Sequence, residues 1–493
     1  MTNPTRPIAL CQAALAALGI TVSSAAQLEP PAPLRLYTQQ VDVRFASAEE
    51  AARATVRFAP VFDDRQWALS ARWDDNHAGS LTMREVMARN GLKGTFYLNQ
   101  TDAKGQFGAD YARELMQDGC SVGGHTQTHP KLAQVTPGAA FCEILANRVE
   151  REAQTDRPMV SFAFPYGQFR SDDHPRLWET TTRALNRAGF SHCLYLDFVR
   201  ENPYLPTNEF SSVLQVVPGD REVNARQFRE RLGKILESGD AFSEHSRCIS
   251  LGVHPWQTGD EWRKLEELFR EDLAGRDNWW YCNQDEYAAY HRQVHRSRLE
   301  ALPLEEEATV RRYTLHRPHP ADLGAMTPLT CVVEGGQVEA VSMDEAAVEV
   351  RAVEGAAIVN VPHAAGKGLP TRIGSIHMPG AGDTPTEPPM CDDFPRVRML
   401  LETDGVGEIS LQCTSEVDLR DVWVRFRLPV QYTEGVLTKA VEIIAAGQTK
   451  TVAIPLPAKR EDPFWAEGPQ LYVAEVDFTA ADGPGRLFVT LLR

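Results

Sequence analysis

The sequence predicts an α/β fold: a distorted (β/α) barrel of about seven parallel strands, followed by one or two small all-β domains. Three observations support this prediction. Short apolar segments alternate with amphipathic helical patterns from about residue 66 to 302. The helical patterns largely vanish after Leu302. The later apolar runs are separated by turns rich in Gly, Pro and Asp. At 493 residues, the chain is also too long for one ordinary core.

Seven short apolar segments are the predicted barrel strands: residues 67–73, 94–98, 120–123, 160–164, 192–196, 248–253 and 278–282. Helical patterns separate them. One pattern places five apolar residues on a single helical stripe: Trp262, Leu265, Leu268, Phe269 and Leu273. Strands that are each followed by a helix imply a parallel sheet, and a barrel closes such a sheet most economically.

Beyond Leu302, five apolar runs are predicted to form antiparallel strands of sandwich type: residues 329–341, 422–430, 451–457, 470–478 and 486–492. The Pro- and Gly-rich stretch 378–389 resembles a linker. The predicted division is a leader (1–30), a barrel with an N-terminal extension (31–302), a β domain (303–385) and a β-sandwich domain (390–493).

Composition excludes several classes of partner. Lys and Arg number 51 against 67 Asp and Glu, a net charge of −16, which argues against nucleic acid or an anionic membrane as the partner. The nine cysteines are scattered and form no C-x-x-C pair. Neither a disulfide framework nor a cysteine zinc site is therefore expected. The oligomeric state stays open.

The N-terminus resembles a secretory signal, with one Arg, an apolar run from Ile8 to Val22 and small residues at 23–26. It predicts an extracytoplasmic protein, periplasmic or secreted. The alternative is an Ala-rich amphipathic helix on a cytoplasmic protein. No other segment approaches the ~20 apolar residues of a membrane span, so no transmembrane segment is expected in the mature chain.

Polar side chains follow several of the predicted strands. Four strands contribute Asp74 and Asp75, His125 and His129, Tyr166, and His254. Each fragment is commonplace alone: an Asp pair often caps a turn, and H-x-x-x-H pairs occur by chance on helices. The carboxyl ends of barrel strands share one rim, however, where functional groups gather. The sequence therefore predicts one site built from all four strands.

These motifs resemble those of the polysaccharide deacetylase family (carbohydrate esterase family 4, the NodB-homology domain). The order is D-D, H-T-x-x-H, F-x-x-P-Y-G and an apolar strand that ends in His, over roughly residues 66–302. The resemblance implies a distorted β/α barrel with one divalent metal, usually zinc. Its ligands would be Asp75, His125 and His129.

The resemblance also implies roles for the other motif residues. Asp74 would be the general base, His254 the general acid for the leaving amine, and the backbone N–H of Tyr166 an oxyanion donor. A three-ligand zinc lowers the pKa of bound water toward neutrality. Trp256, beyond His254, is the predicted sugar platform, and Pro165 and Tyr166 are further predicted substrate contacts.

The resulting prediction is N-deacetylation of an amino sugar polymer. Two alternatives stay open: an O-acetyl polysaccharide esterase, and a catalytically weak carbohydrate-binding protein on the same fold. Nothing in residues 303–493 indicates a second active site, so the β domains are interpreted as accessory carbohydrate-binding or packing domains.

The sequence departs from the family pattern at four positions. Ala163 stands where the third motif usually has an Arg that holds the base, Asn76 replaces a Gly, Gly252 replaces an apolar pocket residue, and Asp197 is the nearest candidate for the fourth motif. Strand alternation puts Arg72 on the same inner face as Asp74. We therefore hypothesise that Arg72 orients Asp74 in place of the missing Arg. The alternative is that Arg72 pairs with another barrel carboxylate.

Four further residues near the predicted strands are expected to have other roles. Asn283 is expected to cap the helix that follows it, although it could reach the rim. His77 is expected to contact substrate or solvent, since the metal triad is complete without it. Trp279 and Trp280 are expected to fill the core.

Overall fold

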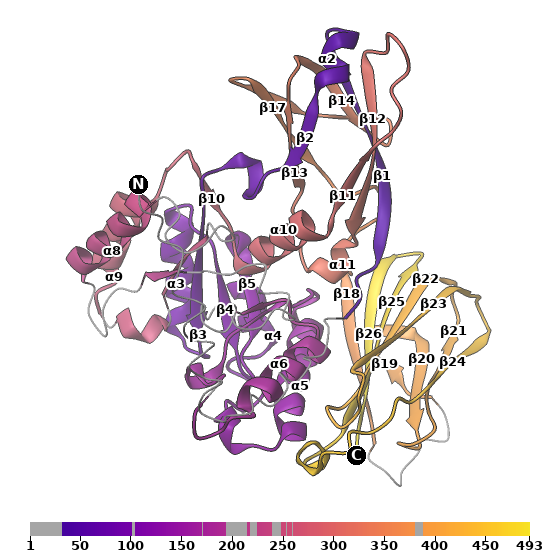
Figure 1. Cartoon of the computed structure of the whole chain (residues 1–493). Coiled ribbons are helices and arrows are strands. Elements are labelled where there is room, and N and C mark those ends of the chain that lie inside the picture. The colour runs from indigo at the N-terminus through magenta and orange to yellow at the C-terminus, as the bar shows by residue number, and fades with distance from the viewer. Residues whose placement is uncertain are drawn as a thin grey trace, which may run out of the picture.

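The structure is a computed structural model that describes residues 32–100, 104–169, 171–193, 214–216, 224–238, 248–252, 254–258, 260–379 and 388–493. The predicted leader and Asp197 lie outside these residues. Figure 1 shows a sheet with helices around it. Beside this sheet lie strands from the N-terminal part of the chain, in indigo, and strands from the C-terminal part, in orange and yellow.

The central sheet has eight strands, all parallel where they pair (Figure 1). They are β3 (Trp67–Asp74), β4 (Gly94–Leu98), β5 (Ser121–Gly124), β6 (Ser161–Phe162), β7 (His192–Cys193), β8 (Leu214–Val216), β9 (Cys248–Leu251) and β10 (Trp279–Tyr281). Their order is β7-β6-β5-β4-β3-β9-β8, and β10 pairs with the beginning of β3. The predicted parallel α/β sheet is confirmed, although no pairing between β7 and β8 closes it within the part of the chain that the structure describes. The sequence did not predict β8, whose three residues show no clear pattern.

Helices follow the strands as the pattern predicts: α3 (Gly79–Arg89), α4 (Ala109–Leu115), α5 (Pro137–Thr155), α6 (Leu177–Ala188), α8 (Ala225–Ser238), α9 (Trp262–Leu268) and α10 (Gln284–Arg296). α5 begins where the Thr136 side chain accepts from the N–H of Ala139, with Pro137 in the first turn. α10 begins at Asn283, whose capping box with Glu286 confirms the predicted capping role.

Alternation along β3 places its side chains as predicted. Trp67, Leu69 and Trp73 join the apolar core that the sheet shares with its helices, whereas Arg72 and Asp74 bond to each other. α10 packs against β3, β4, β5, β6 and β7. Trp279 and Trp280 are buried, which confirms their predicted place in the core.

A first β unit combines the N-terminal extension with the strands after the barrel (Figure 1). One sheet has the order β11-β12-β1-β14-β15 and the other β16-β17-β13-β2, with one shared core. The strands are β1 (Leu36–Phe45), β2 (Thr55–Phe58), β11 (Arg298–Ala301), β12 (Val310–Pro318), β13 (Leu329–Glu334), β14 (Val338–Met343), β15 (Ala346–Val348), β16 (Val350–Val353) and β17 (Ala356–Val361), with α2 (Ala48–Arg53) after β1 and α11 (Pro320–Leu323) after β12. The predicted division placed the N-terminal extension with the barrel. Its strands β1 and β2 pair with strands of this β unit instead.

A second β unit contains the sheets β18-β26-β25-β22-β23 and β19-β20-β21-β24. Its strands are β18 (Arg372–Met378), β19 (Met390–Cys391), β20 (Phe394–Thr403), β21 (Glu408–Ser415), β22 (Leu419–Arg427), β23 (Val436–Ile444), β24 (Thr449–Pro455), β25 (Leu471–Ala480) and β26 (Gly483–Leu492). The predicted boundary near residue 385 would leave β18 in the first unit, but β18 pairs with β26. That pairing is parallel, unlike the antiparallel pattern expected, and the long connection between the two strands permits it.

The eight cysteines among the described residues are all free. Within the same residues, no helix combines the length and apolar character needed to cross a bilayer.

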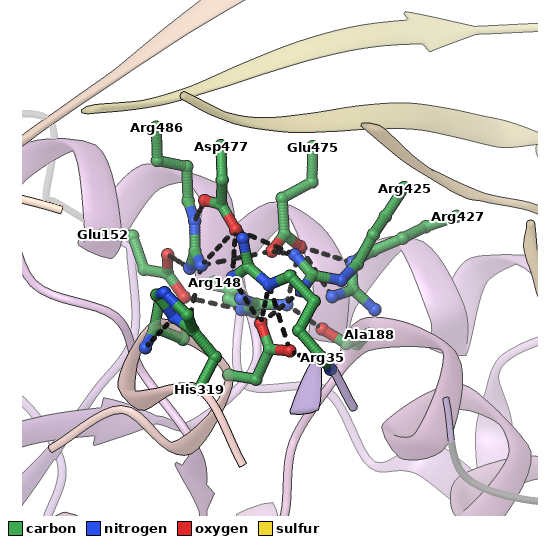
Figure 2. Close-up of polar contacts among 12 residues, drawn as sticks. Arg35, Arg148, Glu152, Ala188, His319, Arg425, Arg427, Glu475, Asp477 and Arg486 are labelled. Carbon is green, nitrogen blue, oxygen red and sulfur yellow. Dashed lines mark hydrogen bonds and ion pairs between the residues drawn. The ribbon is translucent and has the colours of Figure 1, made fainter. Parts of the chain in front are cut away.

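A buried cluster of charges joins the second β unit to α5 and α11 (Figure 2). It contains five arginines and four carboxylates: Arg35, Arg148, Arg425, Arg427, Arg486, Glu152, Asp322, Glu475 and Asp477. Arg486 of β26 lies 2.9 Å from Glu152 of α5 and 2.6 Å from Asp477 of β25. The side chains are 0–14% exposed, so the ion pairs are shielded from water.

Candidate metal centre

Three of the predicted residues form a compact group of metal-ligand type. The Asp75 Oδ1 lies 3.3 Å from His125 Nε2 and 3.2 Å from His129 Nε2. One ligand atom from each residue lies within 4.8 Å of the others. Asp75 follows β3 and His125 follows β5, so the carboxyl ends of the strands bring them together, as predicted.

The hydrogen bonding of His125 favours a cation between it and Asp75. Its Nδ1 lies 2.7 Å from the carbonyl oxygen of Ala163, which can only accept, so Nδ1 carries the proton. In the neutral ring, Nε2 then presents a lone pair toward the Asp75 carboxylate. A divalent metal, or a second proton, must separate these two acceptors. The contact to a backbone carbonyl is also the usual way in which proteins orient a metal-binding histidine.

The electrostatics at Asp75 agree with a cationic environment. Burial raises the pKa of this carboxyl, but hydrogen bonds and charge from His125 and His129 lower it more, so the net pKa lies well below the usual range. The carboxylate form, which a metal requires, is therefore the stable one.

Backbone strain is concentrated at this group. Asp75, Thr126, His129 and Tyr166 all have left-handed φ values, of 74°, 64°, 58° and 56°. Such conformations are unfavourable for residues with a side chain and recur at functional sites. The chain thus maintains several strained positions to bring these groups together.

Asp74 lies beside the group and is held by Arg72. The Arg72 Nε donates to Asp74 Oδ1 at 2.9 Å, and Nη2 donates to Oδ2. Both side chains are almost fully buried, at 1% and 4% exposed. The contact that strand alternation predicted is therefore present. A bidentate pair of this kind fixes the plane of the carboxylate.

Ala163 makes room for a neighbouring tyrosine. The methyl group of Ala163 packs against the buried ring of Tyr97 from β4. The Tyr97 hydroxyl donates to Gln284 Oε1, and Gln284 Nε2 donates to Ser250 at 3.1 Å. A Cβ on Gly123 would lie only 2.4 Å from the Tyr97 ring, so this position needs a glycine. Sequence reasoning missed Tyr97.

His254 reaches the same group from the end of β9. Its Nε2 lies 3.5 Å from Asp75 Oδ2. The buried Nδ1 has no hydrogen-bond partner among the described residues. The ring packs on Trp256, with ring centroids 4.9 Å apart. Trp256 is 39% exposed, so one face is available to a ligand.

Tyr166 lies beside His129. It belongs to a 3-10 helix of one turn, Pro165–Gly167. At this position in the first turn, the backbone N–H has no acceptor within the helix. Its ring lies 4.7 Å from that of His129 and is 61% exposed, whereas Pro165 is buried. Between residues 62 and 300, the exposed large apolar side chains of the described chain are Tyr166 and Trp256. Both rings are therefore accessible to a ligand.

Other departures from the family pattern serve local structure. Asn76 bonds to the backbone of Asn99 and Gln100 and so links the ends of β3 and β4. The His77 Nδ1 accepts the N–H of Gly79 at the start of α3. A Cβ at Gly252 would lie 2.1 Å from the Trp73 ring, so a larger residue has no space there.

A buried asparagine, which sequence reasoning also missed, supports His125 from behind. The Oδ1 of Asn147 accepts the backbone N–H of His125 at 3.0 Å, and its Nδ2 donates to the carbonyl of Leu98. It lies on the buried face of α5 between apolar residues. A polar residue on an apolar helix stripe was the signal that could have identified it.

Comparison with known proteins agrees with this geometry. Residues 62–189 match the model of the polysaccharide deacetylase family. The predicted resemblance is confirmed over this stretch, about a quarter of the chain. The match includes Asp74, Asp75, His125, His129 and Tyr166, but His254 lies beyond it.

No curated protein matches the chain. Among solved structures, a family 4 carbohydrate esterase from Streptomyces lividans in complex with acetate is 15% identical, with 44% of this chain and 92% of that one covered and a TM-score of 0.29. A peptidoglycan N-acetylglucosamine deacetylase from Eubacterium rectale is 14% identical (46% and 91% covered, TM-score 0.32). A pseudoenzyme of the same esterase family from Bacillus anthracis is 16% identical (45% and 65% covered, TM-score 0.30).

Replacing His125 or His129 by Ala should remove the metal. Each imidazole would supply one of three protein ligands, and two ligands should not retain a divalent ion against dialysis. Elemental analysis should find about one metal per parent chain and little in either variant. His77→Ala is the matched control, because His77 is only two residues from Asp75 but bonds to Gly79 instead. A full metal complement in both variants would contradict the ligand assignment.

Proposed function

We propose that this protein is a metal-dependent hydrolase that removes acetyl groups from a carbohydrate, and that its substrate is an N-acetylated amino sugar polymer. The observation that carries the proposal is the group of Asp75, His125 and His129, flanked by the Arg72-bound Asp74 and by His254. The family match over residues 62–189 supports the same class of reaction.

One divalent metal would be held by Asp75, His125 and His129. Zinc is the first candidate, because the ligands are imidazole nitrogens and a carboxylate oxygen. When bound, such an ion supplies Lewis acidity to the acetyl carbonyl and lowers the pKa of water.

The residues of the chain divide the proton transfers. Asp74, oriented by Arg72, accepts the proton of the attacking water at a carboxylate oxygen. The N–H of Tyr166 donates to the oxyanion as the tetrahedral carbon forms. His254, as the imidazolium, gives a proton to the leaving nitrogen, which would otherwise depart as an unstable anion. Trp256 and Tyr166 hold the sugar, and Pro165 supports the turn that presents the Tyr166 N–H.

Acetate release from a substrate panel tests the proposal. Metal-loaded protein should release acetate from chitin or peptidoglycan fragments, and Asp74→Asn with a normal metal content should not. Release from acetyl-xylan alone would favour an O-acetyl esterase. Bound metal without release from any substrate would favour a carbohydrate-binding protein on this fold.

His254→Ala should keep its metal and lose amide hydrolysis by about 10²–10⁴-fold, as expected for loss of a general acid. An acetyl ester with a good leaving group needs little protonation, so its hydrolysis should fall much less. The ratio of kcat on the two substrates is the measurement. Equal losses on both would remove the general-acid assignment.

We also propose an extracytoplasmic location, periplasmic or secreted, which is supported by the signal-like leader before residue 31. A polymer such as chitin or peptidoglycan would be accessible there. Cleavage of the leader in a secreting host, read by N-terminal sequencing, tests this location.

A further inference from the structure

Residues 125–129, the metal-ligand loop, lie between β5 and α5 and include two of the three candidate ligands. Thr126 and His129 in this loop have left-handed φ values of 64° and 58°. Thr126 is β-branched and fully buried, so its conformation is especially unfavourable. Contacts from outside the loop must therefore hold it, and the positions of His125 and His129 depend on those contacts.

The helix α5 supplies these contacts from one stripe of its surface. Glu143, Asn147 and Glu150 are spaced by four and three residues, so their side chains lie on the same face of the helix. Asn147 accepts the backbone N–H of His125 at 3.0 Å, and Glu150 accepts the side-chain amide of Gln127 at 2.5 Å. All three side chains of the stripe thus bond to the metal-ligand loop.

Glu143 holds the residue next to the second histidine. Its Oε2 accepts the backbone N–H of Thr128 at 2.7 Å, and its Oε1 accepts the Thr128 hydroxyl at 2.9 Å. Hydrogen bonds to a carboxylate are about twice as strong as bonds between neutral groups. Two such bonds to one residue fix both its position and its orientation, and so the point at which the chain enters His129.

The opposite face of α5 is fixed as well. With 3.6 residues per turn, Arg148 and Glu152 point away from the stripe that contacts the loop. They belong to the buried charge cluster, in which Arg148 lies 3.3 Å from Glu475 and Glu152 lies 2.9 Å from Arg486 (Figure 2). Since Glu475 and Arg486 belong to the second β unit, α5 is a rigid support rather than a mobile helix.

We propose that Glu143 is a positioning residue for the metal ligands, which holds the metal-ligand loop in its ligand geometry before the metal binds. This proposal rests on the metal-dependent function proposed above. A loop that is already in place does not have to be ordered at the expense of binding energy, so the metal binds more tightly. Without Glu143, the backbone at Thr126 and His129 is free to relax from its left-handed conformations, and the metal would have to restore them.

Zinc affinity, measured by competition with a chromophoric chelator, tests the proposal on the full-length protein. Glu143→Ala should raise the Kd for zinc by about 10–100-fold, the usual effect of losing a group that supports a metal ligand. Glu143→Gln should recover part of this loss, because its amide oxygen can still accept one of the two donors. Glu179→Ala is the matched control, since Glu179 is a half-buried glutamate on α6 that bonds to Arg183 of its own helix.

The metal-free protein separates positioning from a general structural role. Amide exchange at Thr128 should be at least tenfold faster in Glu143→Ala, because the N–H loses its acceptor. The thermal midpoint of the metal-free variant should stay close to that of the parent, since both bonds lie at the surface. A lowered midpoint with an unchanged Kd for zinc would instead mean that Glu143 only stabilises the fold, and would overturn the proposal.

The outcomes also distinguish this proposal from the proposed function. Equal zinc affinity in Glu143→Ala and the parent would overturn the positioning role alone. A zinc-loaded parent that releases no acetate, but whose affinity depends on Glu143, would overturn the proposed function alone. A parent that binds no zinc would overturn both.

Discussion

Glu475→Gln should lower the free energy of unfolding by about 3–5 kcal/mol, the range measured when one partner of a buried ion pair is removed. Glu475 is 1% exposed and contacts four arginines: Arg148, Arg425, Arg427 and Arg486. Without its charge, five buried arginines would face three carboxylates. Domains of ordinary size are stable by only about 5–15 kcal/mol, so much of the protein should unfold on mild heating.

Asp462→Asn provides the control for this prediction. Asp462 pairs with Arg176 at 2.6 Å and also joins the parallel-sheet part to the second β unit, but both side chains are more than 40% exposed. Exposed pairs contribute about 0–1 kcal/mol, so its denaturation midpoint should barely move. Arg427→Met in the Glu475→Gln background should recover part of the loss, because it removes an unpaired cation. A change below 1 kcal/mol in Glu475→Gln itself would contradict the stabilising role of the cluster.

The same cluster predicts a loss of stability in acid. Burial raises the pKa of Asp322, but Arg425 and Arg35 lower it more, to about 2. A carboxyl whose pKa is lower in the folded state stabilises the fold above its unfolded pKa of about 4, and this contribution disappears as the pH falls toward 2. The parent should therefore lose stability between pH 4 and 2.

The sequence predicted the candidate site better than it predicted how the parts assemble. Asp75, His125 and His254 could be brought together from the sequence because each follows an apolar strand, and parallel strands end at one rim. Arg72 and Asp74 could be paired because alternation puts residues two apart on one face. Both inferences need only local periodicity and one topology rule.

The assembly could not be predicted because it depends on pairings between distant segments. β1 contains nothing that indicates β12 and β14 as its neighbours, almost 300 residues away. The charges of the buried cluster look like surface residues in the sequence, since Asp, Glu and Arg are mostly exposed in proteins. Tyr97 escaped notice because its hydroxyl partner, Gln284, lies on α10.

Arg72→Met should reduce kcat by about 10–100-fold with the metal content unchanged, the usual cost of losing a group that orients a functional residue. KM should change little, because Arg72 is buried and acts through Asp74 rather than on the substrate. Arg72→Lys, which keeps the charge but not the bidentate geometry, should recover part of kcat. An unchanged kcat in Arg72→Met would contradict the positioning role.

Stability measurements separate this role from folding. Arg72→Met leaves the buried Asp74 carboxylate unpaired, which should destabilise the fold by about 3–5 kcal/mol. Adding Asp74→Asn removes the unpaired charge, so the double variant should recover stability but not turnover. Recovery of turnover as well would show that Asp74 is not the base.

The missing arginine at position 163 gives the sharpest test, because the structure shows why it cannot simply be restored. The Tyr97 ring packs on Ala163, so Ala163→Arg in the Arg72→Met background should be overpacked, less stable and still slow. Adding Tyr97→Ala frees the space, and the triple variant should regain part of kcat as the new guanidinium reaches Asp74. The unfolding free energies of Ala163→Arg and Tyr97→Ala should be strongly non-additive, a coupling that can be measured without any substrate. If the two changes are additive, Tyr97 does not occupy the space of the missing side chain.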